Sequence, residues 1–179
     1  MSSINTVFQK NTRRLVFFLV TFLPGVMHVQ KTLAQTVGNK DFAVLLDNLL
    51  KHTVPEVSAK QIVESKNVLF LDARKKMEFD VSHIENAIWV GYLDFDSCKL
   101  IGIDKQQPII VYCSVGFRSE KIAEKLISSG YKNVKNLYGG IFEWVNSGYD
   151  IVNTQGKTNE VHTFNKDWSK WVLKGEKVY

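Results

Sequence analysis

Two continuous apolar runs constrain the fold of this chain more than any other feature. They are VLFLD at 68–72 and PIIVYC at 108–113. A strand buried on both faces has such an uninterrupted apolar sequence, because neither row of its side chains meets water. Stretches with helical spacing lie between and around these runs, so strands and helices alternate along the chain. This alternation predicts an α/β fold with a mostly parallel central sheet and helices on both faces.

The remaining elements complete this pattern. Apolar residues recur at helical intervals over 41–50, behind a cap at Asn39 or Asp41, and Ser58 can cap a second helix. Pro55 suits a strand at the edge of the sheet. Further strands are predicted at 53–57, 87–90 and 134–137, and further helices at 119–129 and 141–146.

The first 34 residues have the order of an export signal. Basic residues come first, an apolar stretch runs from Leu15 to Val29, and small residues precede a cleavage point after Ala34. The uninterrupted part of this stretch is shorter than the about 20 residues that span a bilayer. We therefore expect a cleaved signal peptide at 1–34 and an exported protein, periplasmic or extracellular, with no stable membrane insertion after cleavage. The alternatives are an uncleaved anchor and a buried helix.

The formal net charge of +5 comes mostly from the same segment. The segment holds four basic residues and no acid, and the rest of the chain has 19 basic against 18 acidic residues. The charge balance therefore gives no reason to expect a nucleic-acid partner for the folded part. The four histidines and two cysteines show no metal-ligand spacing, so neither a metal nor a cofactor is expected.

The segment YCSVGFRSEKIAEKL at 112–126 holds the candidate catalytic group. Cys113 ends the second buried run. The sites of α/β folds lie just beyond the C-terminal ends of the strands, which is where this residue falls. The chain then enters a helix, so backbone N–H groups, the helix dipole and Arg118 all favour a thiolate. Gly116 permits a tight turn, and Ser119 can cap the helix or bond within the loop. Taken alone, a cysteine at the end of a core strand is more often a small apolar residue.

The spacing Cys-x-x-Gly-x-Arg-Ser after a buried strand resembles the active-site loop of the rhodanese family of sulfurtransferases. The resemblance includes LDAR at 71–74 and the closing segment LYGGIFEWVNSGYDIV at 137–152. It implies a rhodanese-like α/β domain at 53–152. This domain would follow a helical extension at 35–52 and precede a C-terminal extension at 153–179.

The resemblance also implies a reaction. Cys113 would attack the outer sulfur of thiosulfate or of a persulfide donor, and would carry that sulfur as a persulfide to a thiophilic acceptor. The partners implied are thus small sulfur donors and thiol acceptors. The residues implied to bind the transferred group are Arg118 and the loop residues Ser114, Val115, Gly116, Phe117 and Ser119. Because the loop holds no second charged side chain, a donor less charged or more apolar than thiosulfate is an alternative.

Four further residues match the family's pattern and are candidates for supporting roles. Asp72 could polarise the loop, although an acid at the end of such a strand more often fixes a local turn. Arg74 and Glu78 match a pair that orders the following segment, and structure is the favoured role for such ion pairs. His83 matches the family's Gly-His-Ile, with Ser82 in place of the glycine. Sulfur transfer between thiolates needs no general base, which favours a structural histidine.

Two other functions are compatible with parts of the pattern. One is a rhodanese-like binding module without physiological catalysis, and the presence of Cys113 argues against it because many such modules lack the cysteine. The other is a cysteine-dependent phosphatase or arsenate reductase. Phosphatase loops have one residue more between cysteine and arginine than the four at 114–117, because a phosphoryl group needs a wider cradle.

The C-terminal extension has an apolar pattern of its own. Phe164, Trp168, Trp171 and Val172 recur at helical spacing, which predicts a short amphipathic helix ended by Gly175. Such a helix either packs back on the domain or offers a docking face to a protein partner.

The second thiol, Cys98, is expected to stay unpaired with Cys113. The strand at 108–113 carries Cys113 to its far end, whereas Cys98 belongs to the connection that enters the strand. This places the two beyond the Cα separation of about 7 Å that a disulfide tolerates.

Overall fold

The structure is a computed structural model that describes residues 37–179. The signal peptide expected at 1–34 therefore lies outside the described residues. In chain order the elements are α1 (Lys40–Leu49), β1 (Glu56–Val57), α2 (Ala59–Ile62), β2 (Leu69–Asp72), α3 (Lys76–Val81), β3 (Ile88–Trp89), the 3₁₀ turn η1 (Ser97–Leu100), β4 (Ile109–Tyr112), α4 (Phe117–Ser128), β5 (Val134–Leu137), α5 (Gly140–Asn146), β6 (Ile151–Asn153), β7 (Gly156–Thr158), β8 (Glu160–His162), α6 (Lys166–Ser169) and β9 (Glu176–Val178).

A parallel sheet of five strands, in the order β1-β5-β4-β2-β3, forms the centre of the domain. The two apolar runs are its neighbouring inner strands, with Leu71 opposite Val111. All four residues of β4 are buried, whereas β1 at the edge has only two residues. The parallel α/β architecture predicted from the sequence is confirmed.

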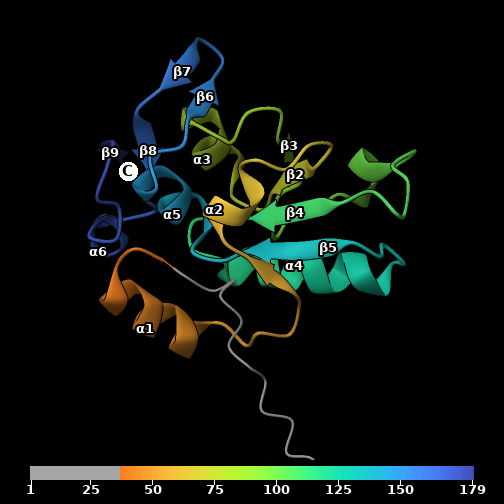
Figure 1. The fold of residues 1–179 in the computed structure, drawn as a ribbon. Coiled ribbons are helices and arrows are strands. Elements are labelled where there is room, and N and C mark those ends of the chain that lie inside the picture. The colour runs from red at the N-terminus through yellow and green to blue at the C-terminus, as the bar shows by residue number, and fades with distance from the viewer. Residues whose placement is uncertain (1–36) are drawn as a thin grey trace, which may run out of the picture. The chain divides into compact units, whose positions relative to one another are not determined.

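Alternating side chains of β4 enter two separate apolar cores. Ile110 and Tyr112 pack with residues of α1, α2 and α5. Ile109, Val111 and Cys113 face the opposite way and pack with α4. Figure 1 shows α4 running along β5. Helices thus cover both faces of the sheet. Cys113, directly after β4, is the last of the side chains that point toward α4.

Side-chain caps fix where the first two helices begin. The Asn39 carboxamide oxygen accepts from the N–H groups of Asp41 and Phe42 at 2.9 and 3.1 Å, so Asn39 is the cap of α1. Ser58 and Gln61 form a reciprocal capping box at the start of α2. These two helices begin where the sequence predicts.

The C-terminal extension differs from its prediction. Its helix, α6, covers only Lys166–Ser169, and Asn165 caps it. Phe164 lies before this helix in a left-handed conformation, and Trp171 and Val172 lie beyond it. A β6–β7 hairpin leads from the domain into the extension, and β8 and β9 form a parallel pair of short strands within it. The predicted helix over 164–172 is therefore wrong in length, because only Lys166–Ser169 are helical.

The apolar residues of the extension still pack on the domain. The Trp171 ring stacks on Phe42 of α1 with ring centroids 5.3 Å apart. Val172 is fully buried in the core that α1 and α5 share. The extension is therefore held against the domain by aromatic and aliphatic contacts.

Both cysteines are free, as predicted. Cys98 is exposed in η1, and Cys113 is buried at the end of β4. Over residues 37–179, no helix combines the length and the apolar character that crossing a bilayer requires. The same part of the chain contains no group of three or more histidine, cysteine or acidic side chains able to hold a metal ion.

Candidate active site

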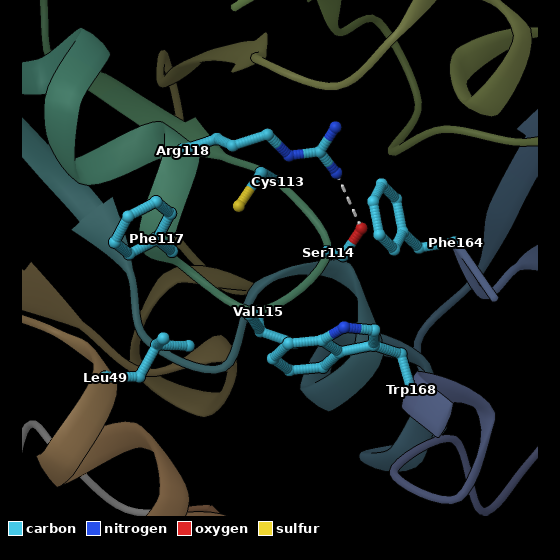
Figure 2. Close-up of a pocket in the computed structure, with 8 residues that line it drawn as sticks. All are labelled: Leu49, Cys113, Ser114, Val115, Phe117, Arg118, Phe164 and Trp168. Carbon is cyan, nitrogen blue, oxygen red and sulfur yellow. Dashed lines mark hydrogen bonds between the residues drawn. The ribbon is translucent and has the colours of Figure 1, made fainter. Parts of the chain in front are cut away.

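The loop between β4 and α4 holds the thiol of Cys113 at its concave side (Figure 2). The Gly116 N–H donates to the Cys113 sulfur at 3.2 Å. Gly116 has φ 115°, a conformation that side chains rarely adopt, and it ends the loop so that α4 begins at Phe117. The helix therefore starts two residues earlier than the predicted Ser119, and Arg118 lies in its first turn.

The N-terminus of α5 supports this loop from behind. The N–H groups of Ile141 and Phe142 donate to the carbonyls of Cys113 and Ser114 at 2.9 and 3.1 Å. A trans peptide directs its N–H opposite to its C=O, so the N–H groups of Ser114 and Val115 point away from α5. These two N–H groups therefore remain available to an anion on the thiol.

Gly140 makes this support sterically feasible. A Cβ at this position would lie 2.4 Å from the Cys113 carbonyl oxygen and 2.6 Å from the Ser114 carbonyl carbon. No side chain fits there without moving the loop backbone. Sequence reasoning missed Gly140, although the GG pair at 139–140 was a usable signal.

A buried polar pair fixes the other end of the loop. The Asn136 amide of β5 donates to the Gly116 carbonyl at 3.1 Å, and the Ser119 hydroxyl donates to the Asn136 side-chain oxygen at 2.7 Å. Both residues are fully buried. Ser119 thus holds the loop from within, as one of the two roles predicted for it. Asn136 was missed, although its place two residues after Val134, on the same face of the predicted strand, was a usable sign.

Glu78 of α3 pairs with Arg118. Its two carboxylate oxygens accept from the Arg118 guanidinium at 2.6 and 2.8 Å, and the same guanidinium donates to the Ser114 hydroxyl at 2.9 Å. Only 1% of the Glu78 side chain is exposed. Burial alone would raise the pKa of Glu78, but hydrogen bonding and the charge of Arg118 outweigh it and lower that pKa to about 2. The guanidinium charge is therefore compensated inside the protein.

The pair expected between Arg74 and Glu78 is not formed. Arg74 instead binds Asp72 through a fork of hydrogen bonds, with its Nη2 at 2.6 Å from a carboxylate oxygen. It also donates to the Ser82 carbonyl at 2.6 Å. Asp72 is engaged by Arg74 and does not polarise the loop. The expected pairing is wrong because Glu78, at the first turn of α3, meets the Arg118 side chain.

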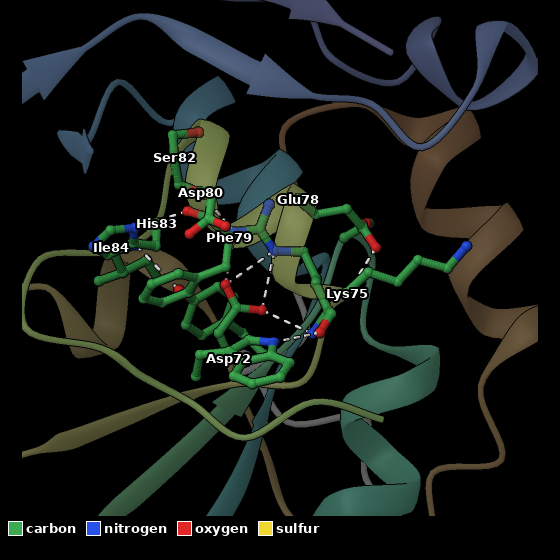
Figure 3. A network of polar contacts seen from close by, with 12 residues as sticks. Asp72, Lys75, Glu78, Phe79, Asp80, Ser82, His83 and Ile84 are labelled. Carbon is green, nitrogen blue, oxygen red and sulfur yellow. Dashed lines mark hydrogen bonds and ion pairs between the residues drawn. The ribbon is translucent and has the colours of Figure 1, made fainter. Parts of the chain in front are cut away.

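His83 lies away from the thiol. Its ring stacks on Phe79 with centroids 3.8 Å apart, and its Nδ1 is 2.9 Å from the Phe79 carbonyl oxygen (Figure 3). Its backbone bridges to Val152. These contacts tie α3 to the C-terminal part of the chain.

The surroundings of Cys113 favour its thiolate. Burial raises the pKa of the thiol, and the positive charge of Arg118, the Ser119 hydroxyl and the N–H groups of Ser119 and Gly116 lower it. The lowering effects prevail, so the pKa of Cys113 lies below its usual value. The exposed Cys98 differs in this respect, because hydrogen bonding to Asp96 raises its pKa.

A pocket of about 360 Å³ opens above the thiol (Figure 2). Its walls are Leu49, Cys113, Ser114, Val115, Phe117, Arg118, Phe164 and Trp168. The structure thus brings most of the predicted loop residues together around one cavity. Leu49 of α1 and the two aromatic residues of the C-terminal extension were not predicted to take part, because nothing local in the sequence places them beside the loop.

Comparison with known proteins gives the same assignment as the loop. A family model described as rhodanese-like domain matches residues 56–147. The tRNA uridine(34) hydroxylases of Yersinia pestis and Yersinia enterocolitica are each 33% identical over an alignment of 98 residues, and the match covers 52% of this chain and 28% of the relative. The chain thus matches less than a third of the length of these relatives.

Solved structures share the fold. A rhodanese-related protein from Thermoplasma volcanium is 27% identical, with a TM-score of 0.50 over 55% of this chain and 97% of that one. A thiosulfate sulfurtransferase from Pseudomonas aeruginosa, 22% identical with a TM-score of 0.50, is covered over 23% of its length and matches 66% of this chain. Together with the family model and the cysteine loop, these matches identify the chain as a member of the rhodanese-like domain family.

Proposed function

We propose that this protein is a sulfurtransferase that moves a sulfane sulfur from a small donor to a thiophilic acceptor through a persulfide on Cys113. The observation that carries the proposal is the state of the Cys113 thiol. It lies at the base of a pocket, accepts an N–H bond from Gly116 and has a lowered pKa. A thiolate is the form that attacks sulfur, so these features describe an activated nucleophile.

The first step forms one sulfur–sulfur bond and breaks another. The Cys113 thiolate attacks the outer sulfur of the donor, and the bond between the donor's two sulfurs breaks. With thiosulfate the leaving group is sulfite, with an organic persulfide it is a thiolate, and with an organic thiosulfonate it is a sulfinate. Each departs with the bonding electron pair. The product is a Cys113 persulfide that carries one negative charge on its outer sulfur.

The loop is built to hold that charge. The free N–H groups of Ser114 and Val115, which point away from α5, can donate to the outer sulfur, and the Arg118 guanidinium adds positive potential. In the second step an acceptor thiolate or cyanide attacks the outer sulfur. The Cys113 thiolate then leaves with its electron pair and is regenerated.

Two observations weigh against phosphoryl transfer at this site. Only four residues separate Cys113 from Arg118, and the Arg118 fork is occupied by the Glu78 carboxylate. A phosphoryl group would need that fork for its own oxygens. The arrangement suits a single sulfur atom better than a tetrahedral oxyanion.

A donor-to-cyanide assay tests the proposal. Purified protein receives thiosulfate or an organic thiosulfonate together with cyanide, and thiocyanate formation is measured. We expect turnover by the wild type and by Cys98→Ser, and none by Cys113→Ala. Thiocyanate formation by Cys113→Ala at the wild-type rate would overturn the proposal.

Export of the mature chain is a separate proposal that rests on the sequence of residues 1–34 alone. Expression of the full chain followed by N-terminal sequencing of the secreted or periplasmic fraction tests it. A mature N-terminus at Gln35 is expected, and a product that keeps residues 1–34 in the membrane fraction would contradict cleavage.

A further inference from the structure

We propose that the pocket selects a sulfur donor that carries an apolar organic group, such as an alkyl or aryl persulfide, over the thiosulfate dianion. This inference rests on the proposed function, because it names the donor of the same reaction. It assigns the selection to Phe164 and Trp168, whose side chains form the outer wall of the pocket (Figure 2).

Much of the pocket wall comes from outside the family domain. Five lining side chains are apolar: Leu49, Val115, Phe117, Phe164 and Trp168. Three of them, Leu49 and the two aromatic residues of the extension, lie outside the residues 56–147 that the family model matches. Segments outside the matched domain therefore supply part of the cavity wall around the loop.

The charges of the site disfavour a dianion. Arg118 is the only charged side chain among the lining residues, and its charge is paired with the Glu78 carboxylate through two hydrogen bonds of 2.6 and 2.8 Å. A dianion entering this pocket would lose its hydration, and the one cation among the lining residues is already paired. A further cation, the Lys75 ammonium, lies 5.8 Å from the centre of the Phe164 ring and does not line the pocket. An uncharged or singly charged donor avoids most of this cost.

The volume of the pocket also exceeds what one sulfur atom requires. At about 360 Å³ it lies in the range of small-molecule sites, which is roughly 300 to 1,000 Å³. Burial of an apolar group against aromatic walls stabilises a complex in proportion to the apolar area removed from water. The organic part of a donor can fill this space while its outer sulfur reaches Cys113.

Backbone strain at Phe164 indicates that its position is held. Its φ of 67° lies in the left-handed region, which is unusual for a bulky residue. The Phe164 N–H donates to the Nδ1 of the buried His162 at 3.1 Å, which fixes the turn. The ring then lies 5.6 Å from the centre of the Arg118 guanidinium. A side chain that is 45% exposed is thus held over the catalytic loop at a conformational cost.

Transfer from an organic persulfide forms one sulfur–sulfur bond and breaks one. The Cys113 thiolate attacks the outer sulfur of R–S–S⁻, the new sulfur–sulfur bond forms, and R–S⁻ leaves with the electrons of the broken bond. No oxidant or reductant is needed. The apolar group R stays in the pocket until the thiolate R–S⁻ departs.

Three probe donors separate charge from apolar contact. Benzenethiosulfonate and methanethiosulfonate are both monoanions and differ in their organic group, and thiosulfate is a dianion without one. We measure kcat/KM for sulfur transfer to cyanide with each donor and divide it by the rate of the same donor with a free small thiol. The wild type is expected to prefer benzenethiosulfonate over methanethiosulfonate at least about tenfold, and thiosulfate is expected to be the poorest donor.

Variants of the outer wall test the assignment. Phe164→Gly removes the ring at a backbone position that glycine favours, so the fold should be retained. Phe164→Gly and Trp168→Ala are each expected to reduce the benzene-to-methane preference about threefold or more. Leu173→Ala, an exposed residue of the same extension that does not line the pocket, is the matched control and should keep the wild-type preference.

The outcomes distinguish this inference from the proposed function. A wild-type preference near one, or a preference that survives both Phe164→Gly and Trp168→Ala, overturns the selection of apolar donors while sulfur transfer stands. Absence of sulfur on Cys113 with all three donors, checked by mass spectrometry, overturns both proposals.

Discussion

Replacing Gly140 with alanine is predicted to disturb the catalytic loop directly. The added Cβ would lie 2.4 Å from the Cys113 carbonyl oxygen, at least about 1 Å inside a favourable contact distance. The obstructing atoms belong to the backbone of the loop, so no side chain can move away. Overpacking of this kind costs about 1 to 3 kcal/mol, and the left-handed conformation of Gly140 adds about 1 to 2 kcal/mol for alanine.

The total expected loss of unfolding free energy is therefore about 2 to 5 kcal/mol, a large part of the 5 to 15 kcal/mol typical of a domain. Urea unfolding of the protein measures this loss from the shift of the transition midpoint at constant slope. Gly130→Ala is the matched control. Gly130 has φ 94°, and a Cβ added there would have no atom within 4 Å, so its replacement by alanine reports the conformational cost alone.

The same replacement of Gly140 should weaken the nucleophile. Moving the Cys113 and Ser114 carbonyls rotates their peptide planes, so the N–H groups of Ser114 and Val115 no longer point toward the side of the loop that holds the thiol. We expect the loss of these donors to raise the pKa of Cys113. The pH dependence of iodoacetamide alkylation, measured in a Cys98→Ser background, reports this shift. A Gly140→Ala protein no less stable than Gly130→Ala, with an unchanged alkylation midpoint, would refute the role assigned to the α5 contact.

Further predictions concern the charges of the loop. Arg118→Lys is expected to lower kcat/KM in the cyanide assay at least about tenfold, because an ammonium cannot donate to Glu78 and Ser114 in the planar geometry of the guanidinium; unchanged kinetics would show that the charge alone suffices. The lowered pKa of Glu78, about 2 against a usual 4.5, contributes stability that is present above pH 4.5 and is lost as the pH falls toward 2. Glu78→Gln should lack that part of the acid dependence in urea unfolding, and parallel curves for variant and wild type would contradict the pairing. For Cys113, whose pKa is also lowered, stability should rise with pH from the folded pKa up to the ordinary thiol value, and Cys113→Ser should lose this rise.

The sheet could be predicted from the sequence because strands that are buried on both faces have uninterrupted apolar sequences. The runs that became β2 and β4 are apolar except for Asp72 at the end of β2, and the side chains of both strands pack into the cores on both faces of the sheet. The cysteine loop was equally predictable, because its spacing after a buried strand fixes a strand–loop–helix geometry. The first residue of its helix was not, since the left-handed Gly116 lets α4 begin at Phe117.

The C-terminal extension shows where periodicity misleads. The spacing from Phe164 to Val172 suits one helical face, but the apolar residues are buried by separate contacts. Trp171 stacks on Phe42, and Trp168 lines the pocket. Contacts with distant elements thus bury these apolar side chains without a continuous helix.

Ion-pair partners were beyond sequence reasoning for a related reason. Arg74 and Glu78 are neighbours along the chain, yet Glu78 binds Arg118, 40 residues away. Which acid meets which base depends on how α3 packs against the loop that follows β4. The same holds for the contacts of Gly140 and Asn136, whose partners are set only by the folded backbone.

Peptide mass spectrometry of the protein after a single exposure to a sulfane-sulfur donor tests the central claim most directly. The donor is benzenethiosulfonate or thiosulfate without acceptor, and the peptides that contain Cys98 and Cys113 are compared after blocking with an alkylating reagent. We predict a gain of one sulfur atom on the Cys113 peptide and none on the Cys98 peptide. The added sulfur should disappear when cyanide is supplied, with thiocyanate formed in equal amount. An unmodified Cys113 peptide, or a sulfur on Cys98 alone, would contradict the assignment of Cys113 as the sulfur carrier.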